Sequence, residues 1–524
     1  MIKNILFHAL TICWLSLFTF AQPPPADILI RNGRLLDGSG VAEKISDIAI
    51  TGDRITFIGD AKKSKLTAKR TIDAKGLIVA PGFIDPHTHA DEDLSNANRN
   101  SNINYLMQGV TTVTINNDGT SVLPLSKRFA LFQSQGIGTN AILLVGQGTV
   151  RQAVLGMSDA APNSEQLEQM KVIVRQAMND GAFGMSTGLY YAPGSFSKTE
   201  EVIELAKIVA ANDGIYDSHI RDESSYSIGL LGSIEEVIRI GREAKLPVHV
   251  SHIKALGVDV WGQSKQVISI IEKARADGVN ITANQYPYTA SGTSISASLL
   301  PRWAEVGGNA ELLKRIEDPN IRPRLIKEME ENLRKRGGAN AILVTGAKDK
   351  NLNGKRLDEL SKIANKIPIE TALEIIKNGG ASVVSFNMNE SDIIKFMKQK
   401  WVMTGSDGSS GHPRKYGTYP RKLSDYVLKR KVISLPRFIQ ASSAQVAETF
   451  KVKERGFLRT GYFADVIIFD EKTVAEKATY EAPTTLATGM KFVIVNGKLV
   501  IEDGKYNGAL AGRALRKNAE ARTQ

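Results

Sequence analysis

The chain has 524 residues, of which 42% are hydrophobic and 23% are charged. This length allows a large core and more than one domain, and the composition is that of a globular protein, which excludes a disordered or fibrous chain. The formal net charge is +12. Because the basic residues are scattered and form no nucleic-acid motif, we interpret this charge as a basic surface that favours anionic substrates, and we expect no nucleic-acid partner.

Residues 1–21 have the pattern of a cleavable secretory signal. Lys3 precedes an apolar run from Ile5 to Phe20, and Thr19-Phe20-Ala21 places a small residue at the expected cleavage position. The run is short for a membrane span, so we expect a periplasmic or secreted protein without stable membrane insertion, with an uncleaved anchor as the alternative. The single cysteine, Cys13, lies inside this segment. Any metal would therefore be bound by His, carboxylate or Lys-derived ligands.

Short β-rich runs separated by Gly and Asp turns occupy both ends of the remaining chain. Examples are Ile28-Leu29-Ile30 and Ile48-Ala49-Ile50 near the start, and 464–469 near the end. Such runs are typical of small antiparallel sheets. We predict one small β domain, a β-sandwich, formed from residues 26–80 and 455–513.

Between these ends, eight apolar, β-branched runs alternate with helical patterns. The runs lie around Phe83, 110–113, 142–145, 183–185, 215–216, 248–250, 281–282 and 401–404. Buried parallel strands separated by helices predict a (β/α)8 barrel over residues 81–450, in an α/β protein. The alternation of strands and helices is interrupted at about 302–400, where a charged, helix-forming stretch predicts a helical insertion before the last strand. This insertion could cover the barrel mouth or be a peripheral decoration.

Four histidines lie at the ends of predicted barrel strands. His87 and His89 end the first strand and are spaced so that both point to one side of an extended backbone, His219 ends the fifth strand, and His252 ends the sixth. Catalytic groups of barrels lie at these C-terminal strand ends, so we expect these side chains to converge. His249, three residues before His252, should face the other way and be a structural histidine.

Two carboxylates follow other strand ends. Asp118 comes after the second strand and Asp407 after the eighth. Histidines and carboxylates without thiolates suit one or two divalent ions, with Zn²⁺ as the first choice and Mn²⁺ or Co²⁺ as alternatives. Such ions lower the pKa of water and polarise carbonyl groups, and Asp407 could then carry the proton to the leaving group. The pattern predicts metal-assisted hydrolysis, most naturally of an amide.

Sequence motifs extend over nearly the whole chain after residue 21. They are Pro-Gly-Phe-Ile-Asp-Pro-His-Thr-His at 81–89, Ser-His-Ile-Arg-Asp-Glu at 218–223, Ser-His-Ile-Lys at 251–254, Gln-Tyr-Pro-Tyr at 285–288, Gly-Ser-Asp-Gly at 405–408 and His-Pro-Arg at 412–414. By these motifs the chain resembles the amidohydrolase superfamily and, more narrowly, the D-aminoacylase (N-acyl-D-amino-acid deacylase) family. The resemblance implies that His87 and His89 bind one metal ion, that His219 and His252 bind the other, and that Asp407 is the proton carrier.

The resemblance also implies a binding site for the free carboxylate of the substrate. Lys254, Arg414 and a tyrosine, Tyr286 or Tyr288, should contact it, because a guanidinium, an ammonium and a phenol together make a good carboxylate clamp. The alternatives are ordinary surface cations for Lys254 and Arg414 and a packing role for the tyrosines.

Two positions depart from the family pattern. Asp118 stands where close relatives carry a metal-binding cysteine, and Gln147 stands where relatives often place histidine. A carboxylate can also bind or bridge two ions. We expect a metal-dependent hydrolase that cleaves N-acyl-D-amino acids to a carboxylate and a free D-amino acid. The alternatives are a D-residue dipeptidase, a hydantoinase-like enzyme that opens cyclic amides, and a non-catalytic barrel that serves as a binding module.

Overall fold

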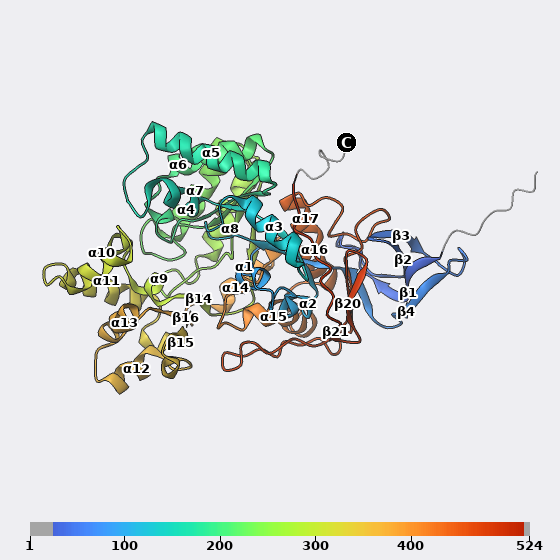
Figure 1. The fold of residues 1–524 in the computed structure, drawn as a ribbon. Helices are drawn as coiled ribbons and strands as arrows, with labels where there is room; N and C mark the ends of the chain where they lie inside the picture. Colours follow the sequence, from blue (N-terminus) through green and yellow to red (C-terminus); the bar gives the residue numbers. More distant parts are fainter. Residues whose placement is uncertain (1–24, 518–524) are drawn as a thin grey trace, which may run out of the picture.

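The computed structural model describes residues 25–517. A barrel of strands and helices forms the middle of the molecule, a β domain lies to one side and an inserted lobe lies to the other (Figure 1). The signal expected in residues 1–21 lies outside the described residues and stays a prediction. In the described part, no helix is both long and apolar enough to cross a membrane.

A nine-stranded sheet contains strands from both ends of the chain. Its strands are β1 (Ala26–Leu35), β2 (Lys44–Thr51), β3 (Arg54–Gly59), β4 (Ala68–Asp73), β5 (Ile78–Pro81), β18 (Val466–Phe469), β19 (Met490–Val495), β20 (Lys498–Glu502) and β21 (Lys505–Tyr506). The two halves join where β5 pairs antiparallel with β18, and Ala80 lies opposite Ile467. Branched apolar side chains such as Ile30, Ile48 and Ile468 are completely buried between the strands and hold this domain together.

Eight barrel strands follow one another in parallel. They are β6 (Phe83–Asp85), β7 (Val110–Ile115), the interrupted strand β8 and β9 (Asn140–Leu143 and Val145–Gly146), β10 (Gly184–Gly188), β11 (Ile215–His219), β12 (Val248–Val250), β13 (Ile281–Gln285) and β17 (Val402–Thr404). A parallel bridge between Thr88 and Gly408 joins the first strand to the last. The eight predicted runs all form strands, and the predicted barrel is confirmed.

Helices cover the outside of the barrel. They are α1 (Asp91–Ser95), α2 (Ile103–Leu106), α3 (Leu125–Gln135), α4 (Gln147–Leu155), α5 (Ser164–Asp180), α6 (Thr199–Ala211), α7 (Gly229–Ala244), α8 (Ser264–Ala276), α14 (Glu390–Met397), α15 (Arg414–Arg421), α16 (Leu435–Ser442) and α17 (Ala444–Phe450). Local sequence sets their ends: α5 begins with a capping box between Asn163 and Gln166 and ends at Gly181, whose φ is 111°. A π-helix, Lys422–Lys429, continues α15.

The inserted lobe lies between β13 and β17. It contains the helices α9 (Ile295–Leu299), α10 (Asn309–Glu317), α11 (Arg322–Lys335), α12 (Leu357–Ala364) and α13 (Pro368–Lys377), and an antiparallel sheet of β14 (Ser291–Ser294), β15 (Ile342–Ala347) and β16 (Ala381–Ser385). The insertion before the last barrel strand is thus mainly helical, as expected, and it also contains a small sheet. The lobe begins at Ser291. Its strand β14 has no apolar residue and pairs with β16 by non-local contacts, whereas β15 and β16 are short β-branched runs whose strand signal was overlooked.

Candidate metal centre and active site

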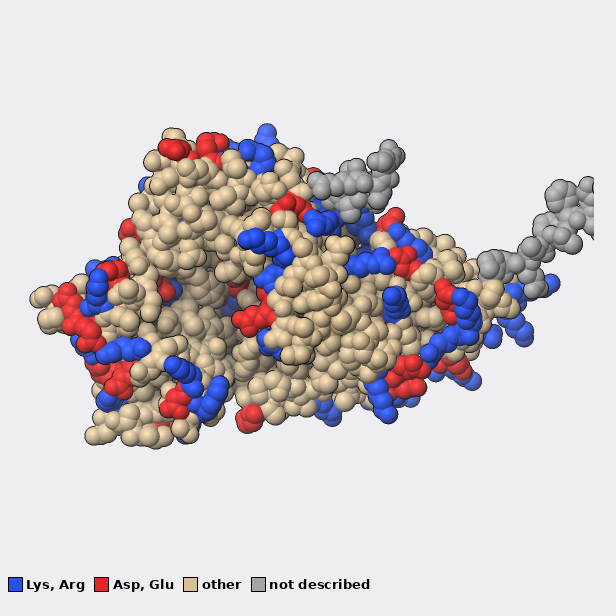
Figure 2. All heavy atoms as spheres, viewed as in Figure 1, with Lys and Arg blue, Asp and Glu red and all other residues tan. Residues whose placement is uncertain are grey.

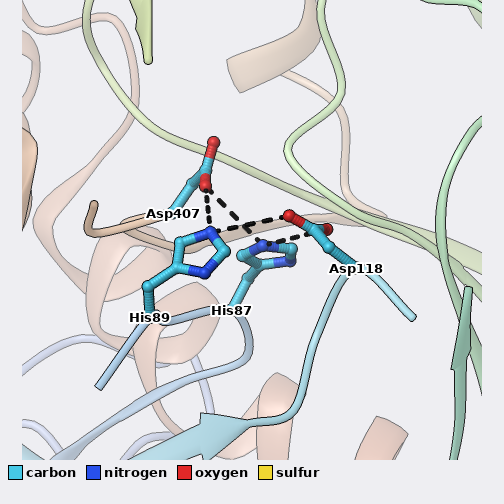
Figure 3. A group of neighbouring side chains, drawn as sticks. All are labelled: His87, His89, Asp118 and Asp407. Carbon is cyan, nitrogen blue, oxygen red and sulfur yellow. Dashed lines mark hydrogen bonds and ion pairs between the residues drawn. The ribbon is translucent and has the colours of Figure 1, made fainter. Parts of the chain in front are cut away.

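Six side chains predicted from the sequence converge where the barrel strands end. His87 and His89 follow β6, Asp118 follows β7, His219 is the last residue of β11, His252 follows β12 and Asp407 follows β17. Their ligand atoms form two groups, and within each group all of these atoms lie within 4.8 Å of one another. One group is His87, His89, Asp118 and Asp407, which Figure 3 shows, and the other is Asp118, His219 and His252. Asp118 belongs to both groups.

The carboxylate of Asp118 lies at the centre of the four histidines. Its Oδ1 is 3.4 Å from Nε2 of His87, 3.6 Å from Nδ1 of His219 and 3.5 Å from Nε2 of His252. Its Oδ2 is 3.5 Å from Nε2 of His89. A carboxylate with imidazoles facing both of its oxygens can bridge two cations.

Unpaired polar atoms in this cluster fit a metal site. Both ring nitrogens of His87, Oδ1 of Asp118 and Nε2 of His219 are buried without a hydrogen-bond partner. Each such atom costs about 1–3 kcal/mol unless something compensates it. Imidazole nitrogens and carboxylate oxygens are ligands that divalent ions such as Zn²⁺ and Mn²⁺ accept. The residues present therefore fit one or two divalent cations.

The backbone also shows strain at this cluster. Asp118, His252 and Asp407 have φ values of 56°, 34° and 47°, in the left-handed region that costs a non-glycine residue about 1 kcal/mol. Such conformations persist where the surrounding structure enforces them, and they gather at functional sites. Gly188 shows the tightness of the fit, because a Cβ there would lie 2.3 Å from the carbonyl oxygen of Asp118.

Asp407 is held between a histidine and an arginine. Its Oδ1 is 3.1 Å from Nε2 of His89, and its Oδ2 is 2.7 Å from Nη1 of Arg414. Burial by itself would raise the pKa of Asp407, but the charge of Arg414, with smaller contributions from the histidines, outweighs it and holds that pKa well below its usual range. Asp407 is therefore an ionised carboxylate in a buried site and can accept a proton.

A second buried ion pair stands beside His252. Nζ of Lys254 is 2.5 Å from Oε1 of Glu223, and the same oxygen is 3.0 Å from Nδ1 of His252. Nδ1 of His252 also lies 2.7 Å from Nζ of Lys254, and its Nε2 lies 2.8 Å from Nδ1 of His219. Glu223 and Lys254 together therefore fix the orientation of this ring. Sequence reasoning gave Glu223 no role, although it lies in the 218–223 motif, four residues after His219.

The residues expected to bind the substrate carboxylate divide into two groups. Lys254 and Tyr286 line a cavity of about 340 Å³ together with His89, Asp118 and Asp407, and Figure 2 shows the surface hollowed between the barrel and the inserted lobe. Arg414 and Tyr288 are buried and are not among the residues that line this cavity. The ring of Tyr288 packs against His412 at 5.3 Å, which agrees with the packing alternative.

Each cation of the expected clamp already has a carboxylate partner inside the protein. Lys254 pairs with Glu223, and Arg414 pairs with Asp407. Low-dielectric surroundings favour such pairing, since an uncompensated buried charge is costly. Contact of Lys254 and Arg414 with the substrate stays a prediction. Within the protein, Lys254 orients Glu223 and Arg414 orients Asp407.

The remaining sequence expectations concern His249 and Gln147. His249 is fully buried, its Nδ1 is 2.8 Å from Oγ1 of Thr282, and its Nε2 accepts a hydrogen bond from Asn284. Burial lowers the pKa of His249 to about 3, so it is a neutral structural histidine, as expected. Gln147 hydrogen-bonds Ser197 instead of facing the cavity.

Several cavity residues carried no signal in the sequence. Tyr190 and Tyr191 follow β10, Tyr226 follows β11, and Arg336 comes from the end of α11 in the inserted lobe. Tyr191 stands over the ring of His219, with ring centres 4.7 Å apart. These residues lie in loops or in the insertion, where no strand-end pattern marks them.

A (β/α)8 barrel with histidines and carboxylates gathered at its C-terminal strand ends is the architecture of barrel metallohydrolases. Residues 70–501 match the amidohydrolase family, and this chain belongs to that family. D-aminoacylase from Alcaligenes xylosoxydans xylosoxydans is 33% identical to it, over 94% of this chain and 98% of the relative.

Two further relatives extend the comparison. N-acyl-D-glutamate deacylase from the same organism is 29% identical, over 94% of this chain and 97% of the relative. The crystal structure of N-acyl-D-glutamate deacylase from Bordetella bronchiseptica, complexed with zinc and a phosphonate inhibitor, has a TM-score of 0.80 and 28% identity, and the match covers 94% of this chain and all of that one.

Proposed function

We propose that this protein hydrolyses N-acyl-D-amino acids to a carboxylate and a free D-amino acid, in a metal-dependent reaction. The observation that carries the proposal is the position of Asp118 between four histidines, with Asp407 on the wall of the same cavity. The relatives named D-aminoacylase and N-acyl-D-glutamate deacylase support the choice of substrate, because each matches nearly the whole chain.

We assign one metal ion to His87, His89 and Asp118 and a second to Asp118, His219 and His252, with Zn²⁺ as the first choice and Mn²⁺ or Co²⁺ as alternatives. When bound, such ions supply Lewis acidity, which lowers the pKa of water and polarises a carbonyl group. Glu223 fixes the orientation of His252, and Arg414 keeps Asp407 ionised.

Asp407 carries the proton in the proposed reaction. Its Oδ1 takes a proton from the attacking water, and the same carboxyl group then gives this proton to the nitrogen of the breaking amide bond. One C–O bond forms and one C–N bond breaks, so water and amide become a carboxylic acid and an amine. Tyr286 and Lys254 lie on the same cavity wall, where they can hold the free carboxylate of the amino acid portion.

The test is amine release by the purified protein from matched N-acetyl-D- and N-acetyl-L-amino acids, with added Zn²⁺, Mn²⁺ or no metal, together with elemental analysis. We expect metal-dependent release from the D-series alone. Release only from D-containing dipeptides or from cyclic amides would select one of the alternative hydrolases. Absence of release from every substrate class, with no metal bound, would favour the binding module.

We also propose export to the periplasm or the medium. The apolar run from Ile5 to Phe20 and the small residue at Ala21 support this. Mass spectrometry of the protein purified from its own cells should find a mature chain that begins at Gln22, whereas a chain that begins at Met1 would contradict cleavage.

A further inference from the structure

Arg336 is a buried cation on the wall of the active-site cavity. It follows α11 in the inserted lobe, is 2% exposed and lines the same cavity as Asp118 and Asp407. Its hydrogen bonds reach neutral acceptors only: Nε donates to the carbonyl of Ser298 at 2.9 Å, and Nη2 donates to the hydroxyl of Tyr190 at 3.1 Å. A weaker contact of 3.4 Å joins Nη1 to the hydroxyl of Ser385.

The charge of Arg336 is not balanced within the protein. Over residues 25–517, none of the ion pairs within 4.0 Å includes Arg336, whereas the other Lys or Arg on the cavity wall, Lys254, is paired with Glu223. Burial of a lone charge is costly, and an anion entering the cavity would remove that cost. Among the described residues that line the cavity, Arg336 is thus the cation whose charge is not balanced by a carboxylate of the protein and can pair with a ligand.

A second polar group stands beside it. Tyr226 lines the cavity, and its hydroxyl is buried without a hydrogen-bond partner. The guanidinium carbon of Arg336 is 5.8 Å from the centre of the Tyr226 ring. A guanidinium with unused N–H groups and a phenol that can donate a hydrogen bond are together suited to a carboxylate.

Arg336 and the expected clamp for the α-carboxylate are separate sets of residues. Tyr286 lies 5.6 Å from Nζ of Lys254 and 4.5 Å from the guanidinium carbon of Arg414, measured to the ring centre. The contacts of Arg336 are instead with Tyr190 and residues of the inserted lobe. The wall of this cavity of about 340 Å³ thus carries Lys254 from the barrel and Arg336 from the inserted lobe. A substrate with two carboxylates could engage both cations.

We propose that Arg336 and Tyr226 bind a carboxylate on the side chain of the substrate, so that the preferred substrates are N-acyl-D-amino acids with acidic side chains. This inference rests on the proposed function and names its substrate class. It makes Arg336 a specificity-determining residue supplied by the inserted lobe.

The experiment compares N-acetyl-D-glutamate with N-acetyl-D-glutamine, which has nearly the same shape without the second charge. We expect the unaltered protein to have a kcat/KM about 50-fold higher for the glutamate compound. Arg336→Met should lower this kcat/KM by about 50-fold and change that for the glutamine compound less than about threefold. Equal losses on both substrates would overturn the inference and would indicate contact with the α-carboxylate or a structural role.

Arg302→Met is the matched control. The Arg302 guanidinium also stacks on Tyr190, 4.6 Å from the ring centre, and donates a hydrogen bond to a backbone carbonyl, that of Ala297. It is paired with Glu305 and lies outside the cavity lining. The preference for glutamate over glutamine should therefore stay unchanged in this variant. A change as large as that in Arg336→Met would assign the effect to the packing around Tyr190 and overturn the inference.

Tyr226→Phe keeps the inference testable where Arg336→Met fails to fold. It removes only a hydroxyl and should lower the preference for glutamate about fivefold, whereas an unchanged preference would remove Tyr226 from the site. Titration calorimetry of Asp407→Asn, which should not turn the ligands over, with N-acetyl-D-glutamate and N-acetyl-D-glutamine compares binding without turnover.

Different results would overturn the proposed deacylase function and the proposed role of Arg336. No release from any N-acyl-D-amino acid would overturn the proposed function, and the calorimetric difference between the two ligands would still decide the role of Arg336. Release from neutral substrates without preference for glutamate would keep the proposed function and overturn this inference.

Discussion

Nη1 of Arg414 lies 2.7 Å from Oδ2 of Asp407, and the two side chains form a buried ion pair. Arg414, which we expected to bind the substrate carboxylate, thus pairs with Asp407, the expected proton carrier. The other oxygen of Asp407, Oδ1, lies 3.1 Å from Nε2 of His89. Arg414 therefore acts on the chemistry by orienting Asp407 and keeping it charged.

Asp407→Asn should abolish turnover, and because it leaves the buried guanidinium of Arg414 without a charged partner, it should also lower the unfolding free energy. The amide keeps the shape of the carboxylate, but it is far too weak a base to carry the proton. We expect kcat to fall by about 10²–10⁴-fold, the usual contribution of a positioned acid–base group. Steady-state kinetics, elemental analysis and thermal unfolding together check this. Near-normal kcat would remove Asp407 from the proton path.

Asp118→Ala should empty the metal centre, because the carboxylate shared by both ligand groups is lost. Asp118→Cys is the informative partner variant, since a thiolate also binds divalent ions but prefers softer ones. We expect the alanine variant to purify with less than about a tenth of the metal, in line with the loss of a shared ligand. The cysteine variant should keep metal, with a stronger preference for Zn²⁺ over Mn²⁺. Unchanged metal content in Asp118→Ala would remove Asp118 from the ligand set.

Lys254→Met should destabilise the protein more than the double variant Lys254→Met, Glu223→Gln. The single change leaves the buried carboxylate of Glu223 without its 2.5 Å partner, which costs about 3–5 kcal/mol of unfolding free energy. The double change removes both charges and should recover a large part of that loss. Denaturant unfolding of the two variants and of Glu223→Gln completes a double-mutant cycle, and simple additivity would contradict the coupling.

Lys422 should make stability depend on pH. It is 1% exposed, and its Nζ donates a hydrogen bond to Oγ1 of Thr404. Burial, with a smaller effect from the charge of Arg437, lowers the pKa of Lys422 from 10.5 to about 7. Between these values the unfolded chain binds a proton that the folded protein lacks, so the contribution of Lys422 to stability rises with pH.

We therefore expect the unfolding free energy to gain about 2 kcal/mol from this group between pH 7 and pH 9. Lys422→Met should remove that gain and be the more stable protein at pH 6. Lys429→Met, at the exposed end of the same π-helix, is the control and should keep the dependence of the parent protein. Denaturant unfolding at several pH values measures all three, and parallel curves for parent and Lys422→Met would contradict the prediction.

The barrel and the metal cluster could be predicted because their signals are local. Each strand is a short apolar run, and His87, Asp118 and Asp407 each stand a few residues after such a run, at the end where barrel sites form. Because all barrel strands end at the same face of the barrel, residues far apart in the sequence become neighbours in space.

The features that sequence reasoning missed depend on contacts between distant residues. Arg336 meets Tyr190 across 146 positions of the chain, and β14 becomes a strand only by pairing with β16. Glu223 lies in a motif that was singled out, but its pairing with Lys254 depends on how two loops approach each other. Periodicity carries no information about such contacts.

The pairing of β5 with β18 has a consequence for synthesis of the chain. Ala80 is made early, but its partner Ile467 follows almost four hundred residues later, in the last part of the chain. At about 5–20 residues per second, the ribosome needs roughly 20–80 s to supply that partner. Throughout this interval the apolar edge of β5 is an open template for aggregation, unless other chain segments or chaperones cover it. The β domain is therefore the first part of the described chain to be made and among the last to be completed.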